Sequence, residues 1–395
     1  MAIRLRRQKS RKWNAAFWAI MRKALISTAI SLAVLSFSAG FSGAQRLDAS
    51  FFLRSPAEVA QDLFQKMISL KPDDGNAMLQ AGLSYWEKGQ RAKAEDLFAR
   101  ALKASPKNCK IPLRIGTAYL KKGEAQKADE MIQRAIKIKP KEEVLYLEAG
   151  LAYLKARQET KAEEMFAKVY QLDPDDEENY LDIGYGYLKA GQVDKAGELF
   201  EKAFKLKPTG YRAFVHTAVA YLEVGQERKA WETYDRALAA KPKEENTPLW
   251  MAMACLKKGQ TAKAEELFAK AVQLDPKDED NYLDMAEIYA ERGQASKVEE
   301  LIGQAVSYAP NKKSLLLRAG LAFLNAGQPA KAEEYFNRSF QAARDDEDLY
   351  VDAGLGYLEK GNMQRAAELF AEGVNLKPKK EKLYLKIGQG YVKKM

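Results

Sequence analysis

The amino-acid sequence predicts an all-α solenoid of nine helical hairpins, and three features of the chain point to this fold. The phrase KAEELFAKAVQLDP at residues 263–276 returns as KAEEMFAKVYQLDP at residues 161–174, and more loosely at seven other places. The units follow one another every 34 residues without an insertion. Each unit also has an earlier apolar segment, so it holds two helices. Stacking is required because one hairpin cannot bury its apolar face alone.

Two small residues mark each unit. The second of them is alanine in eight of the nine units, at Ala94, Ala128, Ala162, Ala196, Ala230, Ala264, Val298, Ala332 and Ala366. The first precedes it by twelve positions, at Gly82, Gly116, Gly150, Gly184, Ala218, Ala252, Ala286, Gly320 and Gly354. The constant spacing places every unit in the same register.

The second segment of each unit is an amphipathic helix that ends at a proline. In one copy, Ala264, Leu267, Phe268 and Ala271 fall at helical spacing, with charged residues on the other faces. Glycine at the end of the first segment, as at Gly259, is typical of a helix C-terminus. Proline cannot continue a helix, and it closes eight of the nine units. The repeated phrase is therefore the second helix of a hairpin and its stop.

This pattern resembles the tetratricopeptide repeat. In one unit it is carried by Tyr180, Gly184, Tyr187, Ala196, Phe200, Ala203 and Pro208. The resemblance covers residues 75–380 as nine units. It implies a right-handed superhelical solenoid in which the first helix of each hairpin lines a concave surface where partners bind.

Capping helices are expected on both sides of the array. Residues 45–74 contain Ser55, Pro56 and Glu58, which are typical of a capping box at a helix start. Residues 381–395 form a trailing helix that should shield the core of the last hairpin.

The N-terminal residues 1–44 have the character of a signal peptide or membrane anchor. Residues 1–23 carry eight basic side chains and no acidic one, and the uncharged segment 24–44 follows, with Ser42 and Ala44 suited to cleavage before Gln45. The favoured interpretation is a cleaved signal that sends the protein to the periplasm or outside the cell. A retained anchor in the inner membrane and an organelle-targeting leader are the alternatives, and membrane contact is expected only if residues 24–44 are retained.

Charge and residue usage argue against several functional classes. Without residues 1–44, 56 Lys and Arg face 54 Asp and Glu, so the net charge falls from +10 to +2 and no nucleic-acid partner is predicted. No residue pattern indicates a catalytic site, a metal site or a cofactor. Cys255 replaces a core aromatic residue and should be buried, whereas Cys109 lies at a turn and is expected to be exposed.

Positions that vary between units are free of the stacking that every unit shares, so they are candidates for partner binding. On the first helices of the central units, the candidates are Leu147, Leu151, Leu181, Tyr185, Arg212, His216, Val219, Trp250 and Met253. Some of these residues could instead pack helix against helix, most of all Leu147 and Leu181. Replacing Tyr185 or Trp250 should cost little folding energy, because both positions vary.

The predicted function is a non-enzymatic scaffold of the bacterial cell envelope that binds a peptide or protein in its concave groove. The alternative is a membrane-anchored assembly factor of a secretion, pilus or polysaccharide-export machine. The only histidine, His216, occupies one of the variable positions, so a catalytic role is not expected.

Overall fold

The computed structural model describes residues 46–395, and every regular element in that range is an α-helix. Nine hairpins follow one another in the predicted register. They are α4 (Gly75–Glu87) with α5 (Arg91–Ala104), α6 (Lys110–Lys121) with α7 (Ala125–Ile138), α8 (Glu143–Lys155) with α9 (Glu159–Leu172), α10 (Glu177–Lys189) with α11 (Val193–Leu206), α12 (Tyr211–Glu223) with α13 (Glu227–Ala240), α14 (Asn246–Lys257) with α15 (Thr261–Leu274), α16 (Glu279–Glu291) with α17 (Ala295–Tyr308), α18 (Lys313–Asn325) with α19 (Pro329–Ala342), and α20 (Glu347–Glu359) with α21 (Met363–Leu376). The short α2 (Ala49–Phe52) and α3 (Pro56–Leu70) precede them, and α22 (Glu381–Lys394) follows. The predicted all-α repeat fold is confirmed.

A glycine against an aromatic ring holds the two helices of most hairpins together. A Cβ atom on Gly150 would lie 2.5 Å from Cε1 of Phe166, and one on Gly184 would lie 2.6 Å from Cε1 of Phe200. Real Cβ atoms do not come so close to a ring. The two helices can therefore approach to this separation only because the inner one carries no side chain at the contact.

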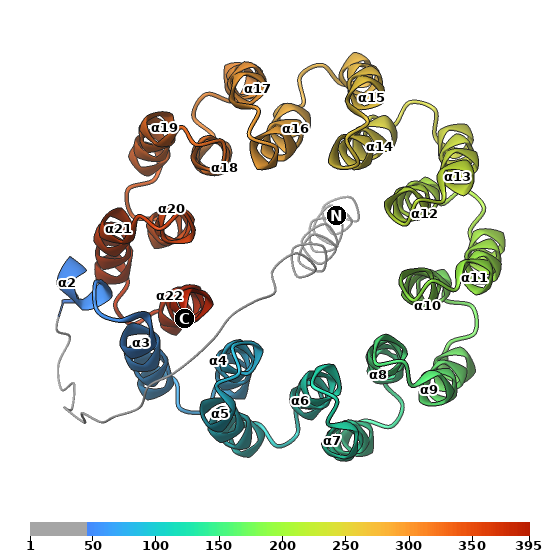
Figure 1. The fold of residues 1–395 in the computed structure, drawn as a ribbon, viewed down its shortest axis with the longest axis horizontal. Coiled ribbons are helices and arrows are strands. Elements are labelled where there is room, and N and C mark those ends of the chain that lie inside the picture. Colours follow the sequence, from blue (N-terminus) through green and yellow to red (C-terminus); the bar gives the residue numbers. More distant parts are fainter. Residues whose placement is uncertain (1–45) are drawn as a thin grey trace, which may run out of the picture.

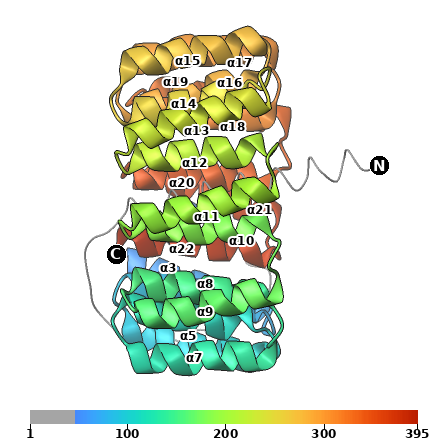
Figure 2. The ribbon, with the colours of Figure 1, turned by 90° about the vertical axis from the view of Figure 1, so that its right-hand side faces the viewer.

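The hairpins are arranged in a ring (Figure 1). The first helix of each hairpin lies on the inside of the ring and the second on the outside. Figure 2 shows the helices stacked side by side with the chain reversing direction at the two rims. The inner helices approach one another closely. Cδ2 of Leu151 would lie 2.5 Å from a Cβ atom on Gly186, and Cδ2 of Leu321 would lie equally close to one on Gly356. Small residues on the inner side thus help to bend the array.

The two flanking helices do not cap opposite ends of an open array. α22 packs against α20 and α21, as expected for a helix that shields the last hairpin, but it also packs against α3 and α4 at the other end of the chain. We call this contact of α22 with α3 and α4 the seam. The seam closes the ring, which the sequence did not predict.

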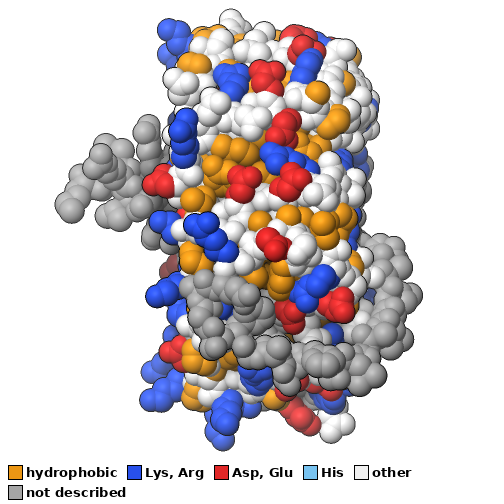
Figure 3. Space-filling view, turned by 90° about the vertical axis from the view of Figure 1, so that its left-hand side faces the viewer, with side chains coloured by type: hydrophobic (Ala, Val, Ile, Leu, Met, Phe, Trp, Pro, Cys, Tyr) orange, Lys and Arg blue, Asp and Glu red, His pale blue; other side chains and the backbone are white. Residues whose placement is uncertain are grey.

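The outer wall has charged side chains of both signs interspersed with apolar ones, as Figure 3 shows for one side. Some of them join neighbouring outer helices: Lys331 of α19 pairs with Glu299 of α17 at 2.5 Å, and Arg365 of α21 pairs with Glu333 of α19 at 2.6 Å. Pairs as exposed as these contribute roughly 0–1 kcal/mol each. Packing of the apolar faces therefore supplies most of the cohesion.

The turn inside each hairpin contains one residue with positive φ. Glycine takes this place in eight turns, with φ between 69° and 83°, but Arg157 takes it between α8 and α9, with φ 60°. We expect Arg157→Gly to raise the free energy of unfolding by about 1 kcal/mol, because the left-handed conformation costs an L-residue roughly that much. Urea unfolding would show this gain as a higher midpoint at unchanged slope. The matched control is Gly191→Arg, which should lower the midpoint, and a lower midpoint for Arg157→Gly would contradict the explanation.

Candidate functional site

The inner wall of the ring carries the side chains that differ from unit to unit. One repeat position recurs along the inner helices as a series, and some of its members contact the equivalent residue 34 positions later. Asp284 pairs with Arg318 at 2.5 Å, and Asp352 pairs with Lys386 at 2.5 Å. His216 and Trp250 form an aromatic pair with ring centroids 4.7 Å apart. The variable positions therefore interact along the wall.

The nine candidate residues divide into two groups by burial. Leu147, Leu181, Val219 and Met253 are buried, with at most 9% of their surface exposed, so their side chains serve helix packing. Leu151, Tyr185, His216 and Trp250 are half-buried, and Arg212 is exposed. Five residues thus remain on the inner helices α8, α10, α12 and α14 as side chains that a partner could reach.

Tyr185 is held more firmly than its variable position suggested. Its hydroxyl lies 3.1 Å from Oγ1 of the buried Thr217 on the next inner helix, and its ring packs against Phe200 at 5.1 Å. The expectation that replacing Tyr185 costs little folding energy is therefore wrong. Its removal would leave a buried hydroxyl without this partner and a gap beside Phe200.

His216 and Trp250 form the aromatic part of the candidate site. Burial lowers the pKa of His216 to about 4, and the nearby Arg212 guanidinium adds to this effect. The imidazole is therefore neutral at pH 7 and lies against the indole as an uncharged ring, with the two planes tilted by 40°. Arg212 itself donates a hydrogen bond from Nε to the Tyr211 hydroxyl at 2.9 Å.

Asp182 belongs to the same series, between Glu148 and His216. Burial raises its pKa to about 6, and the neighbouring carboxylates of Glu178 and Asp176 add to this rise. Within residues 46–395, no ion pair or hydrogen bond holds its carboxylate. Asp182 is therefore an acid that the folded chain places in the wall at a cost in stability.

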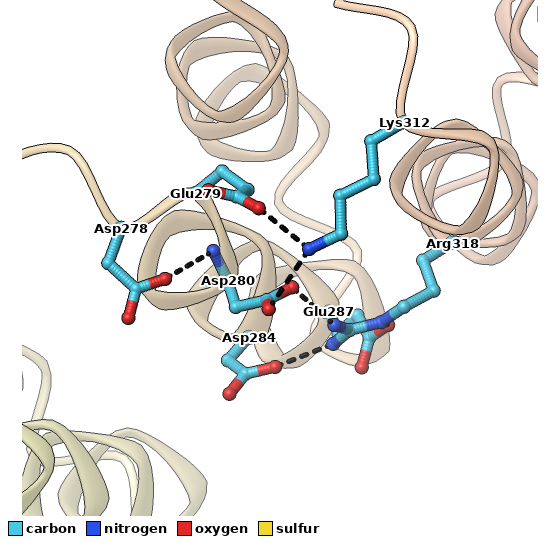
Figure 4. A network of polar contacts seen from close by, with 7 residues as sticks. All are labelled: Asp278, Glu279, Asp280, Asp284, Glu287, Lys312 and Arg318. Carbon is cyan, nitrogen blue, oxygen red and sulfur yellow. Dashed lines mark hydrogen bonds and ion pairs between the residues drawn. The ribbon is translucent and has the colours of Figure 1, made fainter. Parts of the chain in front are cut away.

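Ion pairs join α16 and α18 along the wall, as Figure 4 shows. The Arg318 guanidinium lies 2.5 Å from Asp284, 2.7 Å from Glu287 and 3.4 Å from Asp280. Lys312 reaches Glu279 at 2.6 Å and Asp280 at 3.2 Å. Burial raises the pKa of Asp284 to about 6 although Arg318 opposes the rise. Sequence reasoning missed this network, although Asp284 and Arg318 stand 34 residues apart.

The two cysteines are both buried. Cys255 lies in the core as predicted, but Cys109 is only 4% exposed, so the expectation of an exposed thiol at a turn is wrong. Cys109 comes directly before α6 and directly after a turn that the hydrogen bond from Asn108 N–H to Ser105 O closes. It therefore offers no accessible thiol for a bond between two chains.

Residues 46–395 hold no helix that is long and apolar enough to cross a membrane. In the same range, no group of three or more His, Cys, Asp or Glu side chains is arranged to hold a metal ion. The proposed signal or anchor in residues 1–44 lies outside the described residues.

We expect Asp182→Asn to raise the free energy of unfolding at pH 7 by about 1–3 kcal/mol. The pKa of Asp182 is raised from an ordinary value of 3.8 to about 6, so the folded state binds the proton more tightly than the unfolded state. Stability is therefore lost as the pH rises through this window, and the neutral amide avoids the loss. Urea midpoints at pH 7 and below pH 3.8 measure the gain and its disappearance.

Asp352→Asn is the matched control, because Asp352 occupies the same repeat position but is paired with Lys386. This change should give no gain at pH 7. An equal gain in both variants would show that the unpaired state of Asp182 is not the cause.

Three family models, each described as a tetratricopeptide repeat, match the chain at residues 85–151 and 256–321, at 57–108, 181–245 and 317–380, and at 144–176. No curated protein matches it. Among solved structures, yeast Tom70 is similar at 14% identity, over 81% of this chain and 95% of Tom70, with a TM-score of 0.37. PilW, a widely conserved type IV pilus biogenesis factor, matches at 20% identity over 50% and 92%, with a TM-score of 0.34. MamA matches at 25% identity over 41% and 95%, with a TM-score of 0.29. The family models together cover most of residues 57–380, and the chain belongs to the tetratricopeptide repeat family.

Proposed function

We propose that this chain is a non-enzymatic scaffold that holds a peptide or protein segment against the inner wall of its ring. The tetratricopeptide repeat is suited to protein–protein interaction. The observation that carries the proposal is the composition of the inner wall at α8–α14. There, an indole, an imidazole, a guanidinium and an unpaired carboxylate lie at positions that vary between units.

The chemistry of this wall favours a segment with both apolar and charged side chains. Trp250 and Leu151 offer apolar surface, and large aromatic side chains and arginine are frequent anchors of interfaces. Arg212 could pair with an acidic group of the partner, and Asp182 with a basic one. A polyanion would meet Asp182 and Glu148 as repelling charges, so a mixed peptide fits better than nucleic acid.

A catalytic role for His216 fits the geometry poorly. A general base works best when its pKa lies near the working pH. The pKa of His216 is lowered to about 4, and its ring lies against Trp250. The proposal is therefore a binding function.

We propose further that the protein is exported to the bacterial cell envelope, as periplasmic or secreted protein. The basic residues 1–23, the uncharged residues 24–44 and the small residues before Gln45 support this proposal. The alternative is an inner-membrane anchored assembly factor of a secretion, pilus or polysaccharide-export machine. It is favoured by the length of the uncharged segment, since a spanning helix needs about 20 residues.

Site-directed photo-crosslinking tests the inner wall as the binding surface. A photoreactive amino acid at Arg212, exposed on the inner helix α12, should crosslink a protein or peptide in cells. The same probe at Arg228, exposed on the outer helix α13, should not capture that partner. Trp250→Ala should reduce the yield at position 212 several-fold, because it removes the aromatic anchor.

Trp231→Ala is the matched control for this change, since Trp231 lies on the outer helix α13. Circular dichroism should show equal helicity for the two variants. A partner captured equally well from the inner and outer positions, and unaffected by Trp250→Ala, would place binding elsewhere on the molecule.

Mass spectrometry of the N-terminus separates the two proposed locations. If the leader is a cleaved signal, the protein from the native host begins at Gln45, because Ser42 and Ala44 precede that bond. A chain that retains residues 24–44 and sediments with membranes would support the anchored alternative.

A further inference from the structure

The seam resembles a complete hairpin built from α22 and α3, which lie near the two ends of the described residues. α22 takes the part of the inner helix, and α3 takes the part of the outer one. A Cβ atom on Gly388 would lie 2.5 Å from Cε1 of Phe64, which repeats the 2.6 Å contact of Gly354 with Phe370. Tyr384 also donates its hydroxyl proton to Pro378 O at 2.8 Å, as Tyr180 does to Pro174 O.

The polar contacts across the seam repeat those inside the array. Lys258 Nζ donates to Glu223 O at 2.5 Å, and Lys88 Nζ donates to Lys393 O at 2.7 Å. The residues of the two pairs occupy the same repeat positions, five repeats apart. In the same way, Lys71 pairs with Glu381 at 3.4 Å where Lys207 pairs with Glu177. The ends of the chain therefore recognise each other through the surfaces that hold consecutive hairpins together.

One physical difference separates this hairpin from the other nine. A short turn joins the two helices of each of those hairpins, whereas no peptide connection within residues 46–395 joins α22 to α3 directly. The seam is thus the place where the ring can open while all nine hairpins with a connecting turn stay folded. Opening would expose Phe64 and Met67 of α3 together with Ile387 and Tyr391 of α22, all of which are now buried. Exposed apolar faces of this kind need a new partner.

The segment before α3 strengthens the seam. Tyr391 donates its hydroxyl proton to Phe52 O at 2.5 Å, and Phe52 packs against Phe370 with ring centroids 5.7 Å apart. Asn375 Nδ2 donates to Leu47 O at 2.8 Å. These contacts join the segment before α3 to α21 as well as to α22. The N-terminal surface that packs against α21 and α22 therefore extends from Leu47 to α4.

We propose that the seam is an exchangeable joint through which a second copy of this chain is bound. When it opens, α22 of one copy packs against α3 and α4 of another. The same surfaces are used within one chain and between two chains, so two copies can join through the seam of either copy. Within one chain the two ends have a high effective concentration, so the single-chain ring is the ground state. Joining of copies therefore depends on blocking or opening the internal contact.

Complementary variants of the full chain test the joint. Gly388→Leu places a side chain against Phe64 and disables α22, but it leaves α3 intact. Phe64→Asp puts a charge into the apolar contact and disables α3, but it leaves α22 intact. Each variant alone should have the mass of one chain by light scattering. Their mixture should form a complex of twice that mass, because the intact α3 of one variant can take the intact α22 of the other.

Gly303→Leu is the matched control, since a Cβ atom on Gly303 meets nothing within 4 Å. It should keep its seam closed and stay monomeric when mixed with Phe64→Asp. Hydrogen exchange should show that α22 loses protection in Gly388→Leu but not in the control. A mixture that stays at the mass of one chain although both seam variants are helical and open overturns the proposal, and so does unchanged protection of α22 in both.

A synthetic peptide of residues 381–395 gives a second measurement that does not require two folded variants. It should bind the Gly388→Leu chain, whose α3 face is open, and a peptide carrying the Gly388→Leu change should bind at least tenfold more weakly. Equal binding of the two peptides, or no binding of either, overturns the proposal. Neither experiment depends on the peptide or protein that the inner wall is proposed to hold.

Discussion

The close contact between an inner-helix glycine and an outer-helix phenylalanine ring fixes the packing of five of the nine hairpins and of the seam. It sets the separation of the two helices in a hairpin, as at Gly150 with Phe166. Since real Cβ atoms are excluded at that distance, the same separation recurs wherever the pair recurs. Hairpins of nearly equal shape then stack in nearly equal ways. A ring built from repeated units needs this uniformity, because errors in the angle between neighbours would accumulate along the chain.

Closure of the ring depends on a second property, which is the bend between neighbouring hairpins. Ten hairpins that return to their starting point turn through about 36° each. The bend requires the inner helices to approach more closely than the outer ones. Contacts such as Leu151 with Gly186 allow that approach. A few larger side chains on the inner helices would open the circle into a superhelix without changing any hairpin. The ring is therefore a property of side-chain size along the inner wall and not of the repeat pattern.

This distinction explains what the sequence could and could not predict. Periodicity compares each unit with the next, so it predicted the nine hairpins, their turns and the burial of Cys255. Periodicity does not give the angle between neighbouring hairpins. The contact of Gly388 with Phe64 at the seam could therefore not be predicted, although both residues continue the repeat register. In two cases, a prediction made from the position of a residue within its own unit was wrong. Cys109 lies at a turn but is buried, and Tyr185 lies at a variable position but contacts Thr217 of the next unit. In both, a neighbouring segment decides the environment.

The inner wall divides into a part where ion pairs join neighbouring inner helices and a part where Asp182 has no such pair. Asp284 with Arg318 joins α16 to α18, and Asp352 with Lys386 joins α20 to α22, which is the inner helix of the seam. Asp182, Arg212 and Trp250 lie on α10, α12 and α14, which Figure 1 places across the ring from the seam. Charges that pair within the wall hold its helices together. A carboxylate that is left unpaired lowers the stability of the fold, and a basic group of a bound partner would offset this loss. The side proposed to bind is thus separate from the side that opens, and opening the seam would leave the binding wall intact.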